Sequence, residues 1–106
     1  MRRISAKALA TRLAEPQAKP LLLDVREPHE FAYCHIPGSI NQPMGQIFLN
    51  IGNLKTEQET VVICHHGVRS AQITNFMESH GFRDVLNLDG GVAAWAADVD
   101  PSMPTY

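Results

Sequence analysis

The chain has 106 residues, of which 44% are hydrophobic, and a formal net charge of −2 at pH 7. This length supports one modest hydrophobic core, so we expect a single domain. Acidic and basic residues are interspersed, which gives no basic stripe for nucleic acid and no polybasic helix for an anionic membrane. The N-terminal residues are too polar for an export signal and no segment is long enough to span a bilayer, so we expect a cytoplasmic protein.

Strands and helices are predicted to alternate along the chain. Ser5 is a good helix N-cap, apolar residues then recur at helical spacing, and Pro16 marks the stop. Short apolar runs bounded by turn residues indicate buried strands. The predicted elements are, in order, helix 6–15, strand 21–25, helix 28–33, strand 39–41, helix 43–50, strand 61–64, helix 70–80, strand 85–88 and a last helix that opens at Gly90-Gly91.

This alternation predicts an α/β fold, a mostly parallel small sheet flanked by helices on both faces. We expect residues 1–106 to form one domain with a core at 5–97. Pro101 and Pro104 should leave the tail at 98–106 irregular. There is no internal repeat and no linker.

Cys64 ends the apolar run 60–63, and a glycine-containing loop then leads into the helix predicted at 70–80. Such a loop turns backbone N–H groups inward, and together with the positive end of the helix dipole they favour an anion. We expect this anion to be the thiolate of Cys64, helped by the charge of Arg69. Functional sites of open α/β sheets lie at the carboxyl ends of strands, which is where Cys64 stands. The alternative is a buried cysteine that only packs.

The two cysteines, Cys34 and Cys64, are interpreted as thiols rather than as a disulfide, since no export signal precedes them. Histidines follow both of them directly. Neighbouring residues rarely bind one metal together, and the Cys-x-x-Cys and His-x-x-x-His spacings of zinc sites are missing. We therefore expect no metal and no cofactor.

Three motifs resemble those of one known family. The segment Cys64-His65-His66-Gly67-Val68-Arg69-Ser70 is similar to the active-site loop of rhodanese domains, which reads Cys-x-x-Gly-x-Arg-Ser. The stretch 22–31 with 35–41 resembles the N-terminal signature of that family, and the stretch 81–95 resembles its C-terminal signature. The motifs stand in the order and spacing of the family, which implies a single-domain rhodanese, a thiosulfate sulfurtransferase with the rhodanese-like fold.

The resemblance also implies a reaction. Cys64 would take the outer sulfur of a donor such as thiosulfate, form a persulfide, and pass the sulfur to cyanide or a thiol; a protein acceptor is also possible. A thiolate held by loop amides requires no dedicated base. The remaining loop residues would bind the substrate, namely His65, His66, Gly67, Val68, Arg69 and Ser70. Two roles stay open for Arg69, which either pairs with the sulfonate of the donor or folds back onto a carboxylate such as Glu30.

Some positions depart from the family pattern. His65 and His66 replace the more usual small or basic residues, and we expect their rings to point towards the entrance and to attract an anionic donor mainly below about pH 6.5. Alternatively, they are solvated loop residues without a role. Cys34 stands where glycine is more usual, and is expected to be a buried small residue rather than a sulfur-exchange partner of Cys64.

Several other matching residues are interpreted as scaffold. We expect four polar side chains to form a network beneath the loop, because buried charges need partners. Trp95 is assigned to the core rather than to a ligand platform. The network residues are Asp24, Arg26, Glu30 and His35.

Two other classes of function remain. Some phosphatases and arsenate reductases share the fold and also use a loop from cysteine to arginine, but their loop is one residue longer. Here four residues lie between Cys64 and Arg69, which favours a site sized for one sulfur atom over one sized for phosphate. The other class is a sulfur-relay or docking module for a partner protein, which the sequence does not separate from metabolism of thiosulfate.

Overall fold

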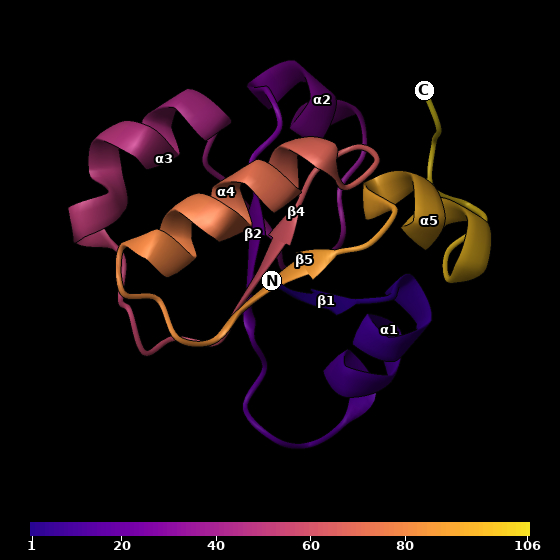
Figure 1. The fold of residues 1–106 in the computed structure, drawn as a ribbon. Coiled ribbons are helices and arrows are strands. Elements are labelled where there is room, and N and C mark those ends of the chain that lie inside the picture. Colours follow the sequence, from indigo (N-terminus) through magenta and orange to yellow (C-terminus); the bar gives the residue numbers. More distant parts are fainter.

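The computed structural model describes residues 1–106, in which five parallel strands form one sheet in the order β1-β5-β4-β2-β3 (Figure 1). The predicted α/β fold is confirmed. The strands are β1 (Arg2–Ile4), β2 (Leu21–Asp24), β3 (Ile40–Asn41), β4 (Thr60–Ile63) and β5 (Val85–Leu88). The helices are α1 (Ala6–Ala14), α2 (Pro28–Tyr33), α3 (Met44–Asn50), α4 (Val68–Ser79), α5 (Gly91–Asp98) and the short 3₁₀ turn η1 (Ile51–Asn53). None of these helices has the length and apolar character that crossing a bilayer requires.

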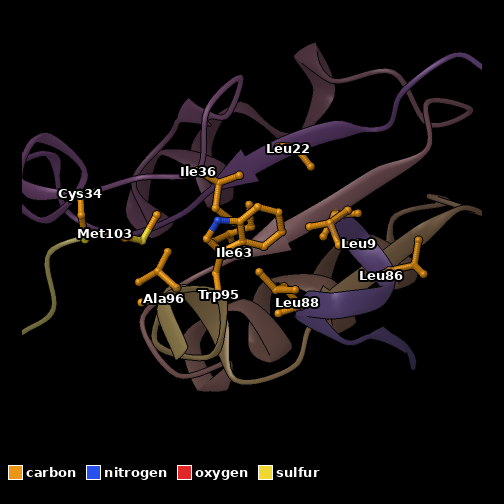
Figure 2. Close-up of a cluster of buried hydrophobic side chains, with 13 residues drawn as sticks. Leu9, Leu22, Cys34, Ile36, Ile63, Leu86, Leu88, Trp95, Ala96 and Met103 are labelled. Carbon is orange, nitrogen blue, oxygen red and sulfur yellow. The ribbon is translucent and has the colours of Figure 1, made fainter. Parts of the chain in front are cut away.

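Helices cover both faces of the sheet, so its inner strands carry apolar side chains on both sides. Alternate residues of β4 show this: Val61 and Ile63 pack with α1 and α5, whereas Val62 packs with α3 and α4. Figure 2 shows the first of these two cores, in which the Trp95 ring lies between the sheet and the helices. Burial on both faces explains why β2 and β4 are nearly continuous apolar runs, and each fully buried aliphatic side chain contributes about 1.5–3 kcal/mol.

The first strand was not predicted from the sequence. β1 pairs in parallel with β5, with Arg2 opposite Leu86 and Ile4 opposite Leu88. The two arginines of β1 are exposed at the edge of the sheet, which is where charged residues are tolerated in a strand.

The residues after α5 have no regular structure, as expected, but they are held against the domain. Met103 is buried and lies beside Cys34 in the core shown in Figure 2. The Tyr33 hydroxyl donates a hydrogen bond to the Thr105 carbonyl oxygen at 3.2 Å. The C-terminal residues therefore return towards α2.

The start of α5 fixes the backbone that follows β4. The Val92 amide donates to the Cys64 carbonyl oxygen at 2.9 Å, and the Ala93 amide donates to that of His65 at 3.1 Å. Gly91 permits this approach, since a Cβ built on it would lie 2.3 Å from the Cys64 oxygen and its φ is +58°.

We therefore expect Gly91→Ala to destabilise the domain by about 2–4 kcal/mol, because a left-handed backbone angle and a contact with rigid backbone both oppose the new methyl group. Urea unfolding followed by circular dichroism would measure the change. Gly45→Ala is the matched control: Gly45 lies in α3 with open space around its Cβ direction, so alanine should leave stability equal or slightly higher. Equal stability of the two variants would contradict this role of Gly91.

Candidate active site

Cys64 follows β4 directly, at the carboxyl edge of the sheet, and its side chain is almost fully buried. Its Sγ accepts a hydrogen bond from the Gly67 amide at 3.0 Å and another from the Ser70 hydroxyl at 3.3 Å. Gly67 has a φ of +98°, which only glycine adopts without strain, and it caps the N-terminus of α4. The loop therefore places donors and the positive end of a helix around the sulfur, as the sequence predicted.

Asn87 in β5 supports this loop and was missed in the sequence. Its side-chain amide donates to the Gly67 carbonyl oxygen at 3.2 Å, and its Oδ1 is hydrogen-bonded to the Ser70 hydroxyl. The Ser70 hydroxyl has a single proton and so can serve Asn87 or the Cys64 sulfur, but not both at once. A charged sulfur would draw that proton towards itself. The only sequence signal was a polar residue within an otherwise apolar strand.

Arg69, in the first turn of α4, pairs with Glu30 of α2. Its Nη1 lies 2.9 Å from Oε1 and its Nη2 lies 3.0 Å from Oε2, a bidentate geometry. Glu30 also belongs to the capping box of α2, where it accepts from the Glu27 amide. The hydrogen bonds from Arg69 lower the pKa of Glu30 to about 2, so the ion pair is intact at neutral pH. Of the two roles left open for Arg69, the structure contains the contact to Glu30.

A second ion pair lies deeper. Arg26 and Asp24 both have fully buried side chains, joined by an Nη2–Oδ2 hydrogen bond of 2.7 Å. Arg26 also donates to the Cys34 carbonyl oxygen at 2.7 Å and to the Glu30 carbonyl oxygen at 3.3 Å, so three of the four residues of the predicted polar network are linked. His35 is not part of it. The end of α2 turns this histidine outward, where its Nδ1 bonds the Phe31 carbonyl oxygen and its ring stacks on the Phe31 ring.

The histidines of the loop have different environments. The His65 ring lies in a stack, 3.8 Å from the Tyr106 ring centroid and 3.9 Å from that of His66. Burial, followed by the charge of His66, lowers the pKa of His65 below 6.5, so its ring is neutral at pH 7. His66 is exposed, and so is Val68 at the start of α4. Tyr106 is a further residue of this region that was not predicted from the sequence.

The two cysteines lie in different cores. Cys64 packs with the α3 and α4 side of the sheet, whereas Cys34 packs with Trp95 and Met103 on the opposite side. Both are free thiols. This arrangement brings Cys64 together with the loop residues and leaves Cys34 apart. No group of three or more histidine, cysteine, aspartate or glutamate side chains is placed to hold a metal ion.

A cavity of about 360 Å³ adjoins the Arg69–Glu30 pair. Its walls are His29, Glu30, Tyr33 and Tyr106. Two of these residues also contact the loop side chains, because Glu30 holds Arg69 and Tyr106 stacks on His65. The cavity beside the Arg69–Glu30 pair is therefore lined largely by aromatic side chains.

The family profile of the rhodanese-like domain matches residues 5–98, which is most of the chain. The chain belongs to the rhodanese-like family. A solved rhodanese-like domain protein from Staphylococcus aureus superposes with a TM-score of 0.84 at 29% identity, covering 100% of this chain and 99% of that one. The resemblance of the three motifs is thereby confirmed, and with it the fold.

Relatives of this rhodanese-like chain include short and long proteins. A sulfurtransferase of Allochromatium vinosum is 36% identical over 93 residues, which are 88% of this chain and 86% of the relative. The rhodanese-like/PpiC domain-containing protein 12, chloroplastic, of Arabidopsis thaliana is 36% identical over 109 residues. The chain spans only 36% of the length of that relative. It spans 23% of the adenylyltransferase and sulfurtransferase uba4 of Ogataea parapolymorpha, at 32% identity over 92 residues.

Proposed function

We propose that this rhodanese-like chain is a sulfurtransferase that moves a sulfane sulfur from thiosulfate, or a related donor, to cyanide or a thiol through a persulfide on Cys64. The observation that carries the proposal is the Cys64 sulfur, held at the carboxyl end of β4 by the Gly67 amide and the Ser70 hydroxyl. No acid or base side chain is hydrogen-bonded to this sulfur, which suits a thiolate nucleophile that acts without a proton acceptor. The relatives named as sulfurtransferases support the same activity.

The reaction has two displacement steps. In the first, the Cys64 thiolate attacks the outer sulfur of thiosulfate, the S–S bond of the donor breaks, and sulfite leaves with the bonding electron pair. In the second, cyanide or a thiolate attacks the terminal sulfur of the persulfide, and Cys64 leaves as a thiolate. The cycle needs no external oxidant or reductant, because the sulfur keeps its oxidation state as it moves. The loop donors would stabilise the negative charge of the persulfide.

The two roles considered for Arg69 are compatible. A guanidinium has five N–H donors, and the bidentate pair with Glu30 uses one hydrogen on each Nη atom. The Nε–H and the outer Nη hydrogens are left, and they form a second fork that matches two oxygens of a sulfonate. We infer that Glu30 orients Arg69 while Arg69 binds the anionic end of the donor.

The acceptor is proposed to be a thiol. The aromatic cavity beside the Arg69–Glu30 pair offers room for the organic part of a small acceptor. A protein acceptor is the second candidate, favoured by one observation: the chain matches part of uba4, whose name joins sulfur transfer to adenylyl transfer. Single-turnover assays that start from the purified persulfide, with cyanide, a small thiol and a candidate protein thiol in parallel, would rank these acceptors.

The size of the loop separates sulfur transfer from phosphate hydrolysis. We expect the wild-type protein to catalyse thiosulfate:cyanide turnover and to leave a generic aryl phosphate intact. Inserting one residue between His66 and Gly67 should impair persulfide formation, because it moves the Gly67 amide away from the Cys64 sulfur. Colorimetric thiocyanate and nitrophenol assays would measure both activities. Substantial phosphate hydrolysis by the wild-type protein would overturn the proposed function.

A further inference from the structure

Tyr106 lies at the meeting point of the candidate active-site loop and the polar network. The residues before it are fixed by the buried Met103 side chain and by the hydrogen bond from Tyr33 to Thr105. Figure 1 shows this part of the chain leaving α5 and rising towards the end of the molecule where α2 lies. Tyr106 is thus placed by contacts that are far apart in the sequence.

The Tyr106 hydroxyl connects the two ion pairs. It donates to Glu30 Oε2 at 2.9 Å and accepts from Arg26 Nη1 at 2.9 Å. Burial raises the pKa of Tyr106, so the hydroxyl keeps the proton that it donates. No other side chain hydrogen-bonds to both Arg26 and Glu30. The anchor at one end, Arg26, is completely buried, whereas about a third of the Arg69 side chain at the other end is exposed.

This link determines how firmly Glu30 is held. Its Oε2 accepts from Arg69 and from Tyr106, and its Oε1 accepts from Arg69 and from the Glu27 amide. Four donors therefore define the orientation of the carboxylate plane, close to the number that a carboxylate can accept. Without the Tyr106 hydroxyl, Glu30 Oε2 would accept a hydrogen bond only from Arg69. Glu30 would then have less support for orienting Arg69.

The ring of Tyr106 makes a separate contribution. It lies nearly parallel to the His65 ring, with an interplanar angle of 8°. His65 follows Cys64 directly, so the ring limits where the first side chain of the loop can move. The hydroxyl and the ring of one residue thus contact two different parts of the candidate site, Glu30 and His65.

We propose that Tyr106 is a positioning residue of the sulfur-transfer site: through Glu30 its hydroxyl orients the Arg69 guanidinium, and its ring holds His65 beside Cys64. The proposal rests on the proposed function for its effect on sulfur transfer, but its geometric part is independent of the reaction.

The first test measures the orientation of Arg69 without any sulfur chemistry. Iodoacetate is an anion and iodoacetamide is neutral, and both alkylate the same thiol. The rate with iodoacetate divided by the rate with iodoacetamide at Cys64 therefore reports the local positive charge. Peptide mass mapping assigns the site. Tyr106→Phe, which keeps the ring and removes the hydroxyl, should lower this ratio about three- to tenfold. Thr11→Val is the control: it also removes one hydroxyl, which bonds the Lys7 carbonyl oxygen within α1 and not Glu30, so the ratio should match that of wild type.

The second test uses turnover. Tyr106→Phe should raise the KM for thiosulfate about three- to tenfold while kcat at saturation stays within about twofold, since the cysteine and its donors are untouched. Tyr106→Leu removes the ring as well, and the pKa of His65, measured by NMR titration, should then rise towards 6.5 as the ring becomes solvated. Tyr106→Phe should leave that pKa low. The other groups that affect the pKa of His65, namely His66, Glu30, Arg69 and the backbone of residue 106, are retained in both variants.

The outcomes separate the two proposals. A Tyr106→Phe protein with a wild-type alkylation ratio overturns the positioning role, whatever the turnover assay gives. A wild-type protein that takes no sulfur from any donor overturns the proposed function, and the alkylation ratio still decides the role of Tyr106. A lower ratio together with an unchanged KM for thiosulfate would show that Tyr106 orients Arg69 but that Arg69 does not bind the donor, which overturns the part of the proposal that concerns sulfur transfer.

Discussion

Replacing Cys64 by serine is expected to abolish sulfur transfer, with a loss of at least about 10³-fold in thiosulfate:cyanide turnover. A serine hydroxyl keeps the size and the hydrogen bonds of the site but stays protonated at neutral pH, and no base lies within reach to remove its proton. The fold should persist, which circular dichroism and thermal unfolding would check.

Cys34→Ser is the matched control for this change, because it alters the other thiol of the chain. Cys34 lies across the sheet from Cys64, so the variant should keep most of the wild-type rate. Its stability should drop modestly, since a hydroxyl would enter a core position beside Met103. A Cys34 variant as inactive as the Cys64 variant would contradict a mechanism with one cysteine.

Arg69→Ala is expected to raise the KM for thiosulfate much more than the KM for cyanide. In the proposed mechanism, cyanide attacks a sulfur that is already on Cys64, whereas thiosulfate must bring its sulfonate to the N–H groups of Arg69 that Glu30 leaves free. Loss of a charge-assisted bidentate contact costs about 1.5–3 kcal/mol, or roughly 10- to 150-fold in kcat/KM. Steady-state kinetics with both substrates varied would measure this difference.

Glu30→Gln tests whether Arg69 binds the donor or only stabilises the loop. The amide keeps the shape of the side chain and removes its charge, so Arg69 would lose its orienting partner but not its own positive charge. We expect a smaller rise in the KM for thiosulfate than in Arg69→Ala. Arg69→Ala with unchanged efficiency towards thiosulfate and a lower melting temperature would show that Arg69 only braces the loop.

His65 and His66 should have little effect on the KM for thiosulfate at neutral pH. Because burial lowers the pKa of His65, its charge would appear only at a pH below its ordinary value of 6.5. The sequence predicted that donor binding improves below about pH 6.5. For His65, we now expect this improvement only at a lower pH.

Local patterns in the sequence were sufficient to predict most of the fold. Apolar runs predicted β2, β4 and β5, and the predicted N-cap Ser5 corresponds to a real helix start. β1 was not predicted because a segment of three residues that includes two arginines has no apolar pattern. Its strand depends on pairing with β5. α4 starts at Val68, two residues earlier than predicted, because Gly67 caps the helix.

The candidate site was predictable only in part. Cys64 and its loop are contiguous in the sequence, so the local pattern was sufficient to predict them. Asn87 and Tyr106 act through contacts with residues 17 or more positions away, which leave no periodic signal in the sequence. The contact of Arg69 with Glu30 likewise depends on how α2 and α4 are packed.

The central claim is that Cys64 carries the transferred sulfur. Intact-mass spectrometry of the reduced protein after incubation with thiosulfate, followed by removal of the donor, tests it most directly. We predict an added mass of one sulfur atom in wild type and in Cys34→Ser, its loss when cyanide is added with formation of thiocyanate, and no adduct in Cys64→Ser. An adduct that persists in Cys64→Ser, or a wild-type protein that gains no sulfur from thiosulfate or from an organic persulfide, would contradict it.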